Sequence, residues 1–321
     1  MRILVHEFAS GGGFAGRPVP RSLAREGRAM LTALVADLSA LRCHDIVTTA
    51  DRRPRRFEDL LGSVDAVWLI APETGGCLER LAETVEHSGK TLLGAGSAAI
   101  RRAADKAQLP RRLARCGVPH PLTRVVHAGN DVRAVAEETG YPLVVKPSRG
   151  AGCEGVRLVR NVRELPAGVA QTVVLQRYVV GVAASVSLIA NGRRAVALSI
   201  NAQSITPARA FAYGGGRTPL VHPLAERGVE AAIRACRAFP NLRGYVGVDL
   251  VLTDSEAVVI EVNPRLTTSY LGVRAALRGP NGDGNIAAMA IEACSGTLPE
   301  PPRPRRRIDF TAGGRLAVRR L

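Results

Sequence analysis

The clearest chemical pattern in the sequence is GVDLVLTDSEAVVIEVNPR, residues 247–265. Alternating residues on either side of a short turn predict a β-hairpin in which Asp249 faces Glu261 and Gly247 faces Asn263. Two carboxylates and an amide then share one face of the hairpin. The opposite face is expected to be entirely apolar and consists of Val246, Val248, Leu250, Leu252, Val258, Ile260 and Val262.

Asp249, Glu261 and Asn263 offer only oxygen ligands, which suit Mg²⁺ and, as a second candidate, Mn²⁺. Two carboxylates so close together repel each other unless a cation lies between them. We therefore predict a metal site at these three residues, and we expect the two carboxylates to repel each other in the metal-free protein. The alternative is a hairpin whose polar side chains face solvent, but such a face would carry more charges and of both signs.

A second pattern is PLVVKPSRGAGCEGV, residues 142–156, in which Lys146 ends an apolar strand and a loop with Gly150, Gly152 and Gly155 follows. Glycine-rich backbone can wrap closely around phosphates and donate N–H groups to them. The spacing is not that of a Walker A loop, because no Gly-Lys-Ser/Thr opens a helix. An ordinary hairpin loop is the alternative.

Further candidates are weaker when taken alone. The segment VVLQRYVVG, residues 173–181, is a strand ending in glycine that could present its backbone to an adenine. Gly12 lies in a glycine-rich stretch that we interpret as a substrate loop. Glu73 could bind a substrate amine or cap the following helix. Arg217 could hold a substrate carboxylate.

The elements that position these residues begin with a strand–helix alternation over the first hundred residues. This rhythm predicts a parallel, doubly wound α/β sheet, whose ligands are bound at the carboxyl ends of the strands. Ser10 to Gly13, Asp51 and Glu73 all follow strands. Strands are expected at 2–8, 44–50, 64–71 and 91–96, and helices at 21–41 and 77–88.

The rest of the chain predicts a smaller α/β unit and then antiparallel pairing. A helical segment is expected over 97–117. Asn191-Gly192 is a strong hairpin signal, because both residues tolerate positive φ. A glycine-rich loop is expected at 213–216, and 300–307 is expected to be a surface segment. The remaining expected strands are 122–127, 142–147, 155–160, 173–179, 184–190, 194–200 and the 245–263 hairpin, with a helix at 224–238.

The composition excludes several classes of protein. The formal net charge of +16 could favour nucleic acid, but 41 of the 44 basic residues are arginines spread along the chain, which indicates codon bias; we do not expect nucleic acid as a partner. The three lysines are Lys90, Lys106 and Lys146, and each is a place where a compact ammonium could be needed. No apolar run is long enough to span a membrane, and six scattered cysteines indicate a reducing cytoplasm.

Taken together, Lys106, Lys146 with its glycine loop, QRYVVG, and Asp249 with Glu261 to Arg265 occur in the order seen in ATP-grasp ligases. The chain resembles that family over about residues 97–295. The resemblance implies an ATP-grasp fold with an N-terminal Rossmann-like (pre-ATP-grasp) domain. It implies a substrate domain at 1–105, a small lid subdomain at 106–180 and a large subdomain with the metal site at 181–321.

The resemblance also implies roles for individual residues. Lys106 and Lys146 would hold the phosphates of ATP, and Arg265 would contact the transferred phosphate. The adenine would be framed by Gln176, Arg177, Tyr178 and Val179. The implied reaction phosphorylates a carboxylate to an acyl phosphate, which an amine then attacks, with release of ADP and phosphate. Two departures stand out: the family often has an acidic residue where this chain has Arg177, and the usual ribose-binding Glu is absent.

Within that family, RILVHEFASGGG and APETGG are similar to segments of ligases that join glutamate to tyramine in methanofuran-type cofactor pathways. We therefore expect a small-molecule carboxylate and an amine as substrates, and a homo-oligomer is compatible with the sequence. One alternative is another amino-acid or peptide ligase of pterin-type cofactor biosynthesis. An alternative of another class is a non-catalytic basic module that binds nucleotide or nucleic acid. A dinucleotide site at Gly11 to Gly16 is disfavoured, because residues 17–20 separate these glycines from the helix.

Overall fold

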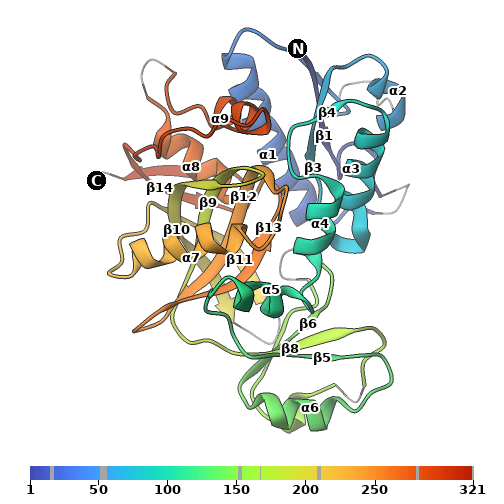
Figure 1. Cartoon of the computed structure of the whole chain (residues 1–321), viewed down its shortest axis with the longest axis vertical. Helices are drawn as coiled ribbons and strands as arrows, with labels where there is room; N and C mark the ends of the chain where they lie inside the picture. The colour runs from blue at the N-terminus through green and yellow to red at the C-terminus, as the bar shows by residue number, and fades with distance from the viewer. Residues whose placement is uncertain are drawn as a thin grey trace.

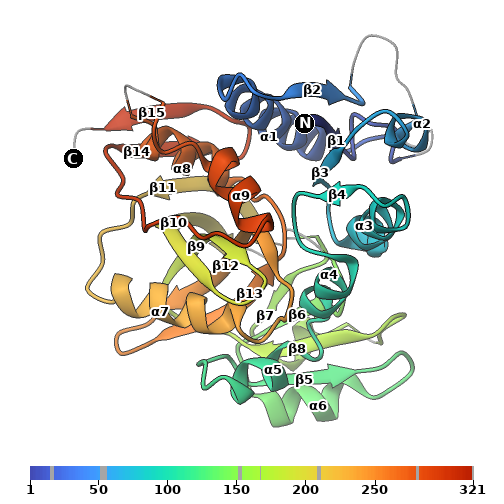
Figure 2. The ribbon, with the colours of Figure 1, turned by 45° about the horizontal axis from the view of Figure 1, so that its top comes forward.

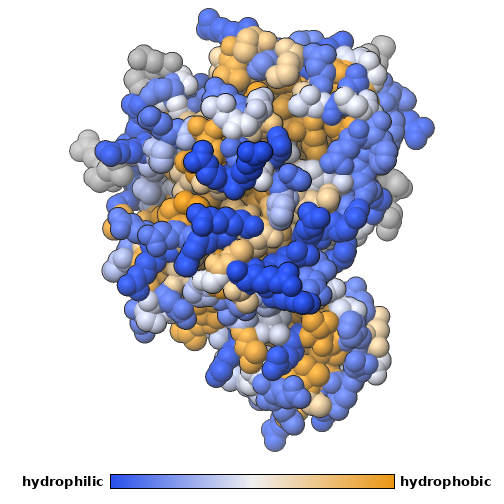
Figure 3. All heavy atoms as spheres, viewed as in Figure 1, coloured by the Kyte–Doolittle hydropathy of each residue, from blue (hydrophilic) through white to orange (hydrophobic). Residues whose placement is uncertain are grey.

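The structure is a computed structural model that describes residues 1–14, 18–50, 56–150, 154–166, 168–207, 211–279 and 282–319. Three β-sheets organise these residues, and Figure 1 shows each one in its own part of the molecule. The space-filling view in Figure 3 shows the smallest part as a lobe at the lower end of the main body. Among the described residues, no helix is long and apolar enough to cross a membrane.

The N-terminal sheet is parallel and has the strand order β2-β1-β3-β4. Alternate residues of its strands face opposite layers: Leu4 and Val67 pack with α3 and α4, whereas Ile3 and Val5 pack with α1. This is the doubly wound arrangement predicted from the sequence. Its elements are β1 (Arg2–Glu7), α1 (Arg21–Ala40), β2 (Asp45–Thr48), α2 (Phe57–Leu61), β3 (Ala66–Ile70), η1 (Thr74–Gly76), α3 (Cys77–His87), β4 (Thr91–Leu92) and α4 (Ser97–Ala104).

The small sheet is antiparallel, has the order β5-β8-β6-β7, and forms the lower lobe with α6 (Figure 1). Its own core includes Val126, Val132, Leu143 and Leu175. The elements of this part are α5 (Leu109–Arg115), β5 (Thr123–Val126), α6 (Val132–Thr139), β6 (Leu143–Pro147), β7 (Arg157–Val159), η2 (Val162–Glu164) and β8 (Val173–Arg177).

The large sheet has seven antiparallel strands in the order β13-β12-β9-β10-β11-β14-β15. Helix α7 covers one face of it, and α8 and α9 pack on the other face (Figure 2). Its elements are β9 (Val182–Asn191), β10 (Ala195–Pro207), β11 (Phe211–Thr218), α7 (Ala225–Cys236), β12 (Arg243–Leu252), β13 (Ala257–Asn263), α8 (Ser269–Leu277), α9 (Ile286–Cys294), β14 (Arg307–Thr311) and β15 (Leu316–Arg319).

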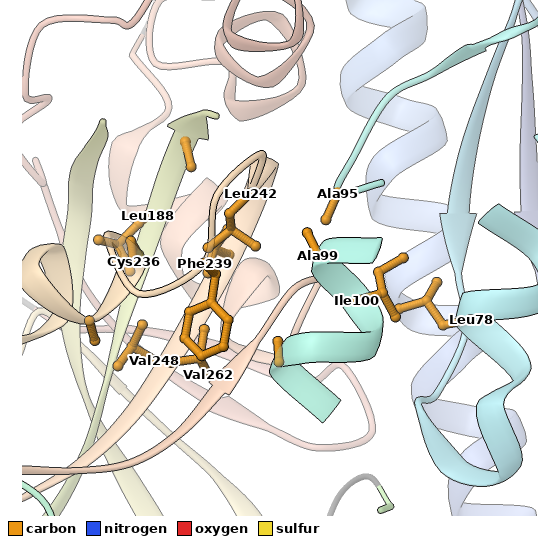
Figure 4. Close-up of a cluster of buried hydrophobic side chains, with 14 of the residues drawn as sticks. Leu78, Ala95, Ala99, Ile100, Leu188, Cys236, Phe239, Leu242, Val248 and Val262 are labelled. Carbon is orange, nitrogen blue, oxygen red and sulfur yellow. The ribbon is translucent and has the colours of Figure 1, made fainter. Parts of the chain in front are cut away.

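The N-terminal and large sheets share their hydrophobic cores. Figure 4 shows Ile100 and Leu78 of the N-terminal part in the same buried cluster as Phe239 and Val262 of the large part. A buried polar contact also joins them: Asp37 on α1 accepts hydrogen bonds from the α8 residues Tyr270 (2.5 Å) and Arg274 (2.6 and 2.8 Å). These contacts fix α1 against α8.

Two sequence expectations about elements are wrong. The helical segment over 97–117 is divided into α4 and α5, and Lys106 lies between them with its N–H donated to the Ser148 carbonyl. The stretch 213–216 is part of strand β11, not a loop. Its glycines permit close strand contact: a Cβ at Gly215, whose φ is +123°, would overlap the Phe310 carbonyl of β14. Helices α2, α6, α8 and α9 and strands β14 and β15 were not predicted.

Candidate active site

The hairpin of β12 and β13 has the predicted register at its polar end. Asp249 pairs with Glu261, and Gly247 pairs with Asn263. Beyond this point a β-bulge shifts the register, so that Leu250 pairs with Val259. The bulge turns Ile260 away from the core and places Val259 and Ala257 in it, which corrects the predicted apolar face.

Asp249 is the most heavily bonded carboxylate of this hairpin. Its Oδ1 accepts from Gln203 Nε2 at 2.8 Å, and its Oδ2 accepts from Asn263 Nδ2 at 2.9 Å. Burial raises the pKa of Asp249 to about 6, and the neighbouring Glu261 acts in the same direction. Because the Asn263 nitrogen is directed to Asp249, the amide oxygen is the Asn263 atom available to a cation or another donor.

Glu261 has a cationic partner that the sequence did not predict. Lys106 Nζ lies 2.6 Å from Glu261 Oε1 and donates to the Gly150 carbonyl, also at 2.6 Å. Burial opposes ionisation of Glu261, but Lys106 and Lys146 outweigh it and hold the pKa of Glu261 below its usual value. The expected repulsion between the two carboxylates is present, because Glu261 raises the pKa of Asp249, but Lys106 relieves part of it by pairing with Glu261.

Lys146 reaches the same cluster from strand β6 of the small sheet. Its ammonium is buried and lies 3.0 Å from Gln176 Oε1, while Gln176 Nε2 donates to Thr123. Burial lowers the pKa of Lys146 to about 8, and Lys106 acts in the same direction. The structure thus brings both predicted phosphate-binding lysines next to the hairpin carboxylates.

The glycine loop after β6 is described in part. Gly155 has a φ of +71°, and a Cβ there would press on the Pro147 ring, so this position requires glycine. Gly150 gives its carbonyl to Lys106, whereas Gly152 lies outside the described residues, as does Asp51.

The segment predicted to frame an adenine follows strand β8. The N–H groups of Arg177 and Tyr178 donate to the carbonyls of Leu122 (2.8 Å) and Pro142 (3.0 Å). These two donors are therefore used within the small sheet, and an adenine would have to meet other backbone groups of Gln176 to Val179.

Arg265 and Glu73 form a buried pair across 192 positions of sequence. Arg265 Nε lies 2.7 Å from Glu73 Oε2, with 16% and 3% of their side chains exposed. Glu73 makes no side-chain cap hydrogen bond at η1, so the capping alternative is not observed. Burial would lower the pKa of Arg265, but Glu73 outweighs burial and raises it.

The predicted substrate loop lies at the carboxyl end of β1. Glu7 holds it by accepting from the N–H groups of Ala9 (2.9 Å) and Ser10 (2.7 Å) and from the Ser10 hydroxyl (2.6 Å). Gly12 is exposed within this loop and has a φ of +88°. The sequence analysis did not predict the role of Glu7, although a carboxylate four residues before a glycine-rich stretch is a recognisable signal.

Arg217 lies away from this cluster. Arg217 pairs with Ala202 of the neighbouring strand β10, so these two side chains share one face of the sheet. Gln203 follows Ala202 and points to the other face, where it contacts Asp249. Arg217 therefore lies on the face opposite to Asp249. Its guanidinium is bound to Asp309 at 2.5 Å and is 54% exposed. The prediction that Arg217 holds a substrate carboxylate at this site is therefore wrong.

Two further residues of the cluster were not predicted. Gln203 lies within a strand whose sequence carries no sign of a functional residue. Tyr213 was expected in a loop, but it lies on β11. Burial raises the pKa of Tyr213, and Asp249 raises it further, whereas a hydrogen bond to Ser269 lowers it. Among the described residues, no group of three or more His, Cys, Asp or Glu side chains could hold a metal ion, so the candidate cation site has only two carboxylates and one amide.

Comparisons with known proteins agree with this arrangement. The chain is 28% identical over 253 residues to the carbamoyl phosphate synthase large chain of Thermus thermophilus, which covers 72% of this chain and 24% of that protein. It is 30% identical over 226 residues to the tyramine–L-glutamate ligase of Methanocaldococcus fervens, which covers 68% of this chain and 65% of that one. The chain thus spans about a quarter of the synthase.

Solved structures show the same fold. An ATP-grasp superfamily protein from Archaeoglobus fulgidus aligns over 96% of this chain and 92% of its own, with a TM-score of 0.67 and 26% identity. D-alanine–D-alanine ligase from Bacillus anthracis, complexed with ATP, aligns over 82% and 86%, with a TM-score of 0.61 and 21% identity.

Sequence profiles of two domain families cover most of the chain. The ATP-grasp domain profile matches residues 103–269, which include both lysines, Arg265 and the carboxylate hairpin. The pre ATP-grasp 3 domain profile matches residues 28–100, within the part that carries the parallel sheet. With more than half of its residues in the first profile, the chain belongs to the ATP-grasp family and has the ATP-grasp fold with an N-terminal pre-ATP-grasp domain.

Proposed function

We propose that this chain is an ATP-dependent carboxylate–amine ligase that forms an amide through an acyl phosphate and releases ADP and phosphate. The observation that carries this proposal is the convergence of Lys106 and Lys146 on the Asp249–Glu261 hairpin, with Arg265 following on the same chain. Family membership supports it, because the profile covers all of these residues.

Lys106 and Lys146 are proposed to bind the phosphates of ATP. Lys106 contacts two oxygens, Glu261 Oε1 and the Gly150 carbonyl, each at 2.6 Å. Phosphate oxygens can replace both partners, because an ammonium is a compact point charge with three donors. The Gly150–Gly155 loop would then add backbone contacts, and Gln176 to Val179 would face the adenine.

Asp249, Glu261 and Asn263 fit a divalent cation by their donor set, since each can offer oxygen and Mg²⁺ prefers oxygen ligands. When bound, Mg²⁺ or Mn²⁺ would neutralise charge that develops on the transferred phosphate. Lys106 occupies only Oε1 of Glu261, so Oε2 can bind a cation while Lys106 stays in place, and Oε1 would become available if Lys106 turned to the phosphates.

The proposed reaction balances in two steps. A substrate carboxylate oxygen attacks the γ-phosphorus of ATP, forming the acyl phosphate as the bond to ADP breaks. The amine nitrogen then attacks the acyl carbon, the C–O bond to phosphate breaks, and the nitrogen loses a proton. Arg265 is proposed to contact the transferred phosphate, and Lys146 to hold it in position.

For the substrates, we propose glutamate as the acid and tyramine or a related amine as the nucleophile, in a one-carbon cofactor pathway of the methanofuran type. The 30% identity to a tyramine–L-glutamate ligase supports this choice. The loop around Gly12 and the buried Glu73 both lie on the N-terminal part, and we propose that they contact the substrates there. The alternatives are another amino-acid ligase and a non-catalytic basic module.

The test is an ADP-release assay with Mg-ATP and a panel of amino acids crossed with amines, including glutamate with tyramine. The expected result is ADP and phosphate in step with an amide identified by mass spectrometry. The Lys146→Met variant, purified in parallel, should release none. Pyrophosphate and AMP in step with product would contradict the proposal, and so would the absence of turnover with every pair.

A further inference from the structure

A large cavity among the described residues lies outside the candidate active site. It is a groove of about 680 Å³ between α1, α8 and the turn that joins β14 to β15. Figure 2 shows these elements side by side at the end of the large sheet. The volume is in the range of small-molecule sites, roughly 300–1,000 Å³.

Arginine side chains give the groove a positive charge. Arg21, Arg25 and Arg28 of α1 line it, and none of its described lining residues is Asp or Glu. Within the described part of the chain, no carboxylate lies within ion-pair distance of these three guanidiniums, although twelve other basic side chains have such partners. Their charge is therefore available to a ligand.

The two acidic residues of α1 are engaged elsewhere. Glu26 accepts a hydrogen bond from Thr268, and Asp37 binds Arg274 and Tyr270. The first turn of α1 contains no acidic residue and has no side-chain cap at Pro20. The positive end of the helix dipole therefore adds to the charge of the arginines at this end of the groove.

The walls of the groove are held in place. Arg274 lines it, but its guanidinium is bound in a bidentate manner to the buried Asp37, which fixes α8 against α1. On the opposite side, Gly313 and Gly314 bring the turn close to α1, since a Cβ on Gly314 would press on Ala29. The arginines of α1 thus line one side of a preformed space.

From this arrangement we infer that the groove is a second binding site, separate from the nucleotide site, for a small polyanion with two or more carboxylate or phosphate groups. Guanidiniums pair with both groups through two parallel hydrogen bonds. Arg21, Arg25 and Arg28 are spaced along α1 over about 10 Å, at 1.5 Å per residue, which suits acidic groups separated by several bonds. Nothing in the proposed ligase chemistry uses this groove.

The test is isothermal titration calorimetry with citrate and, separately, inorganic pyrophosphate as probes, in metal-free buffer. The two probes distinguish carboxylate from phosphate recognition. We expect saturable binding of one probe per chain. The double variant Arg21→Gln with Arg28→Gln should weaken binding by about tenfold or more, because each removes a charged hydrogen-bond donor. Thr32→Trp, which fills the groove without changing charge, should weaken binding as well.

Two control variants distinguish binding in the groove from binding elsewhere on this basic chain. Arg193→Gln with Arg194→Gln removes the same charge from the exposed β9–β10 turn and should change affinity by less than about twofold. Lys146→Met should leave probe binding unchanged. The inference is overturned if the groove variants bind as well as the wild type, if the turn variant loses as much affinity as the groove variant, or if Lys146→Met abolishes binding.

Discussion

The two ends of the candidate active site use different cations. At the end proposed to bind nucleotide, two lysines lie next to the carboxylates of the β12–β13 hairpin, and Lys106 divides its contacts between Glu261 and a loop carbonyl. At the end facing the N-terminal sheet, Arg265 is bound to Glu73, with both side chains largely buried. At both ends, the charges are paired by contacts within the chain.

The difference indicates where partners must change during a reaction. Lysine is a point charge whose donors can be redirected, and burial lowers the pKa of Lys146 to about 8, so its charged form is costly without a ligand. Arginine stays charged and binds in a fixed geometry, and Glu73 raises its pKa further here. The lysines are thus suited to exchange protein oxygens for phosphate, and Arg265 to hold a fixed position.

The largest expected effect is at the end of the site that contains the two lysines. Lys146→Arg should lower kcat/KM for ATP by about 100-fold or more, because the planar guanidinium is larger than the buried ammonium and displaces the phosphates. Steady-state kinetics checks this, with Lys90→Arg as the matched control. Kinetics close to those of the wild type would show that charge alone suffices at this position.

At the Arg265–Glu73 end, substitution should mainly lower the stability of the fold. Glu73→Gln leaves the guanidinium of Arg265 buried without its carboxylate and should lower the free energy of unfolding by about 3 kcal/mol. The exposed pair Arg217–Asp309 is the control, and Arg217→Gln should change the free energy of unfolding by less than about 1 kcal/mol. Urea denaturation measures both. Equal losses for the two variants would remove the distinction between a buried and an exposed pair.

Glu261→Gln tests whether Lys106 neutralises the carboxylate of Glu261. Repulsion alone, as expected from the sequence, predicts unchanged or higher stability. The contact with Lys106 instead predicts a loss of about 1–3 kcal/mol, because a charged hydrogen bond at a buried lysine is weakened. Turnover should also fall sharply. A stabilised Glu261→Gln protein would show that the Lys106 contact does not neutralise the carboxylate.

A smaller effect, of opposite sign, is expected at Asp249. Its pKa of about 6 in the folded chain lies above the usual 3.8, so the folded state is penalised at pH values above 6. Asp249→Asn should therefore stabilise the metal-free protein by about 1–2 kcal/mol at pH 8, since both partners are amides that can present oxygen instead. The gain should shrink as the pH falls from 6 towards 4. A gain that does not vary with pH would contradict the raised pKa.

Much of the hairpin could be predicted because strand periodicity and a short turn define the pairing of Asp249 with Glu261. The bulge at Ile260 could not, since an inserted residue in a strand leaves no mark in residue type. The glycines of β11 misled in the opposite way, because a run of glycines is typical of a loop. Their use became visible only once the Phe310 carbonyl lay beside Gly215.

Partners in the site were harder to predict than its residues. Lys106, Lys146, Glu261 and Arg265 were all expected at the site, but the pairing of Lys106 with Glu261 and of Arg265 with Glu73 joins segments far apart in sequence. Such contacts depend on how the three sheets pack. Arg217 shows the converse error: in a chain with 41 arginines, residue type and a neighbouring glycine stretch do not identify a substrate contact.

The most direct test of the central claim follows oxygen from the acid to phosphate. Glutamate labelled with ¹⁸O in its carboxylates is incubated with Mg-ATP, tyramine and the purified chain, and the released phosphate and nucleotide are analysed by mass spectrometry. An acyl phosphate predicts one ¹⁸O in each phosphate released, unlabelled ADP, and an equal amount of amide. Label in AMP, or amide formed with unlabelled phosphate, would contradict the account.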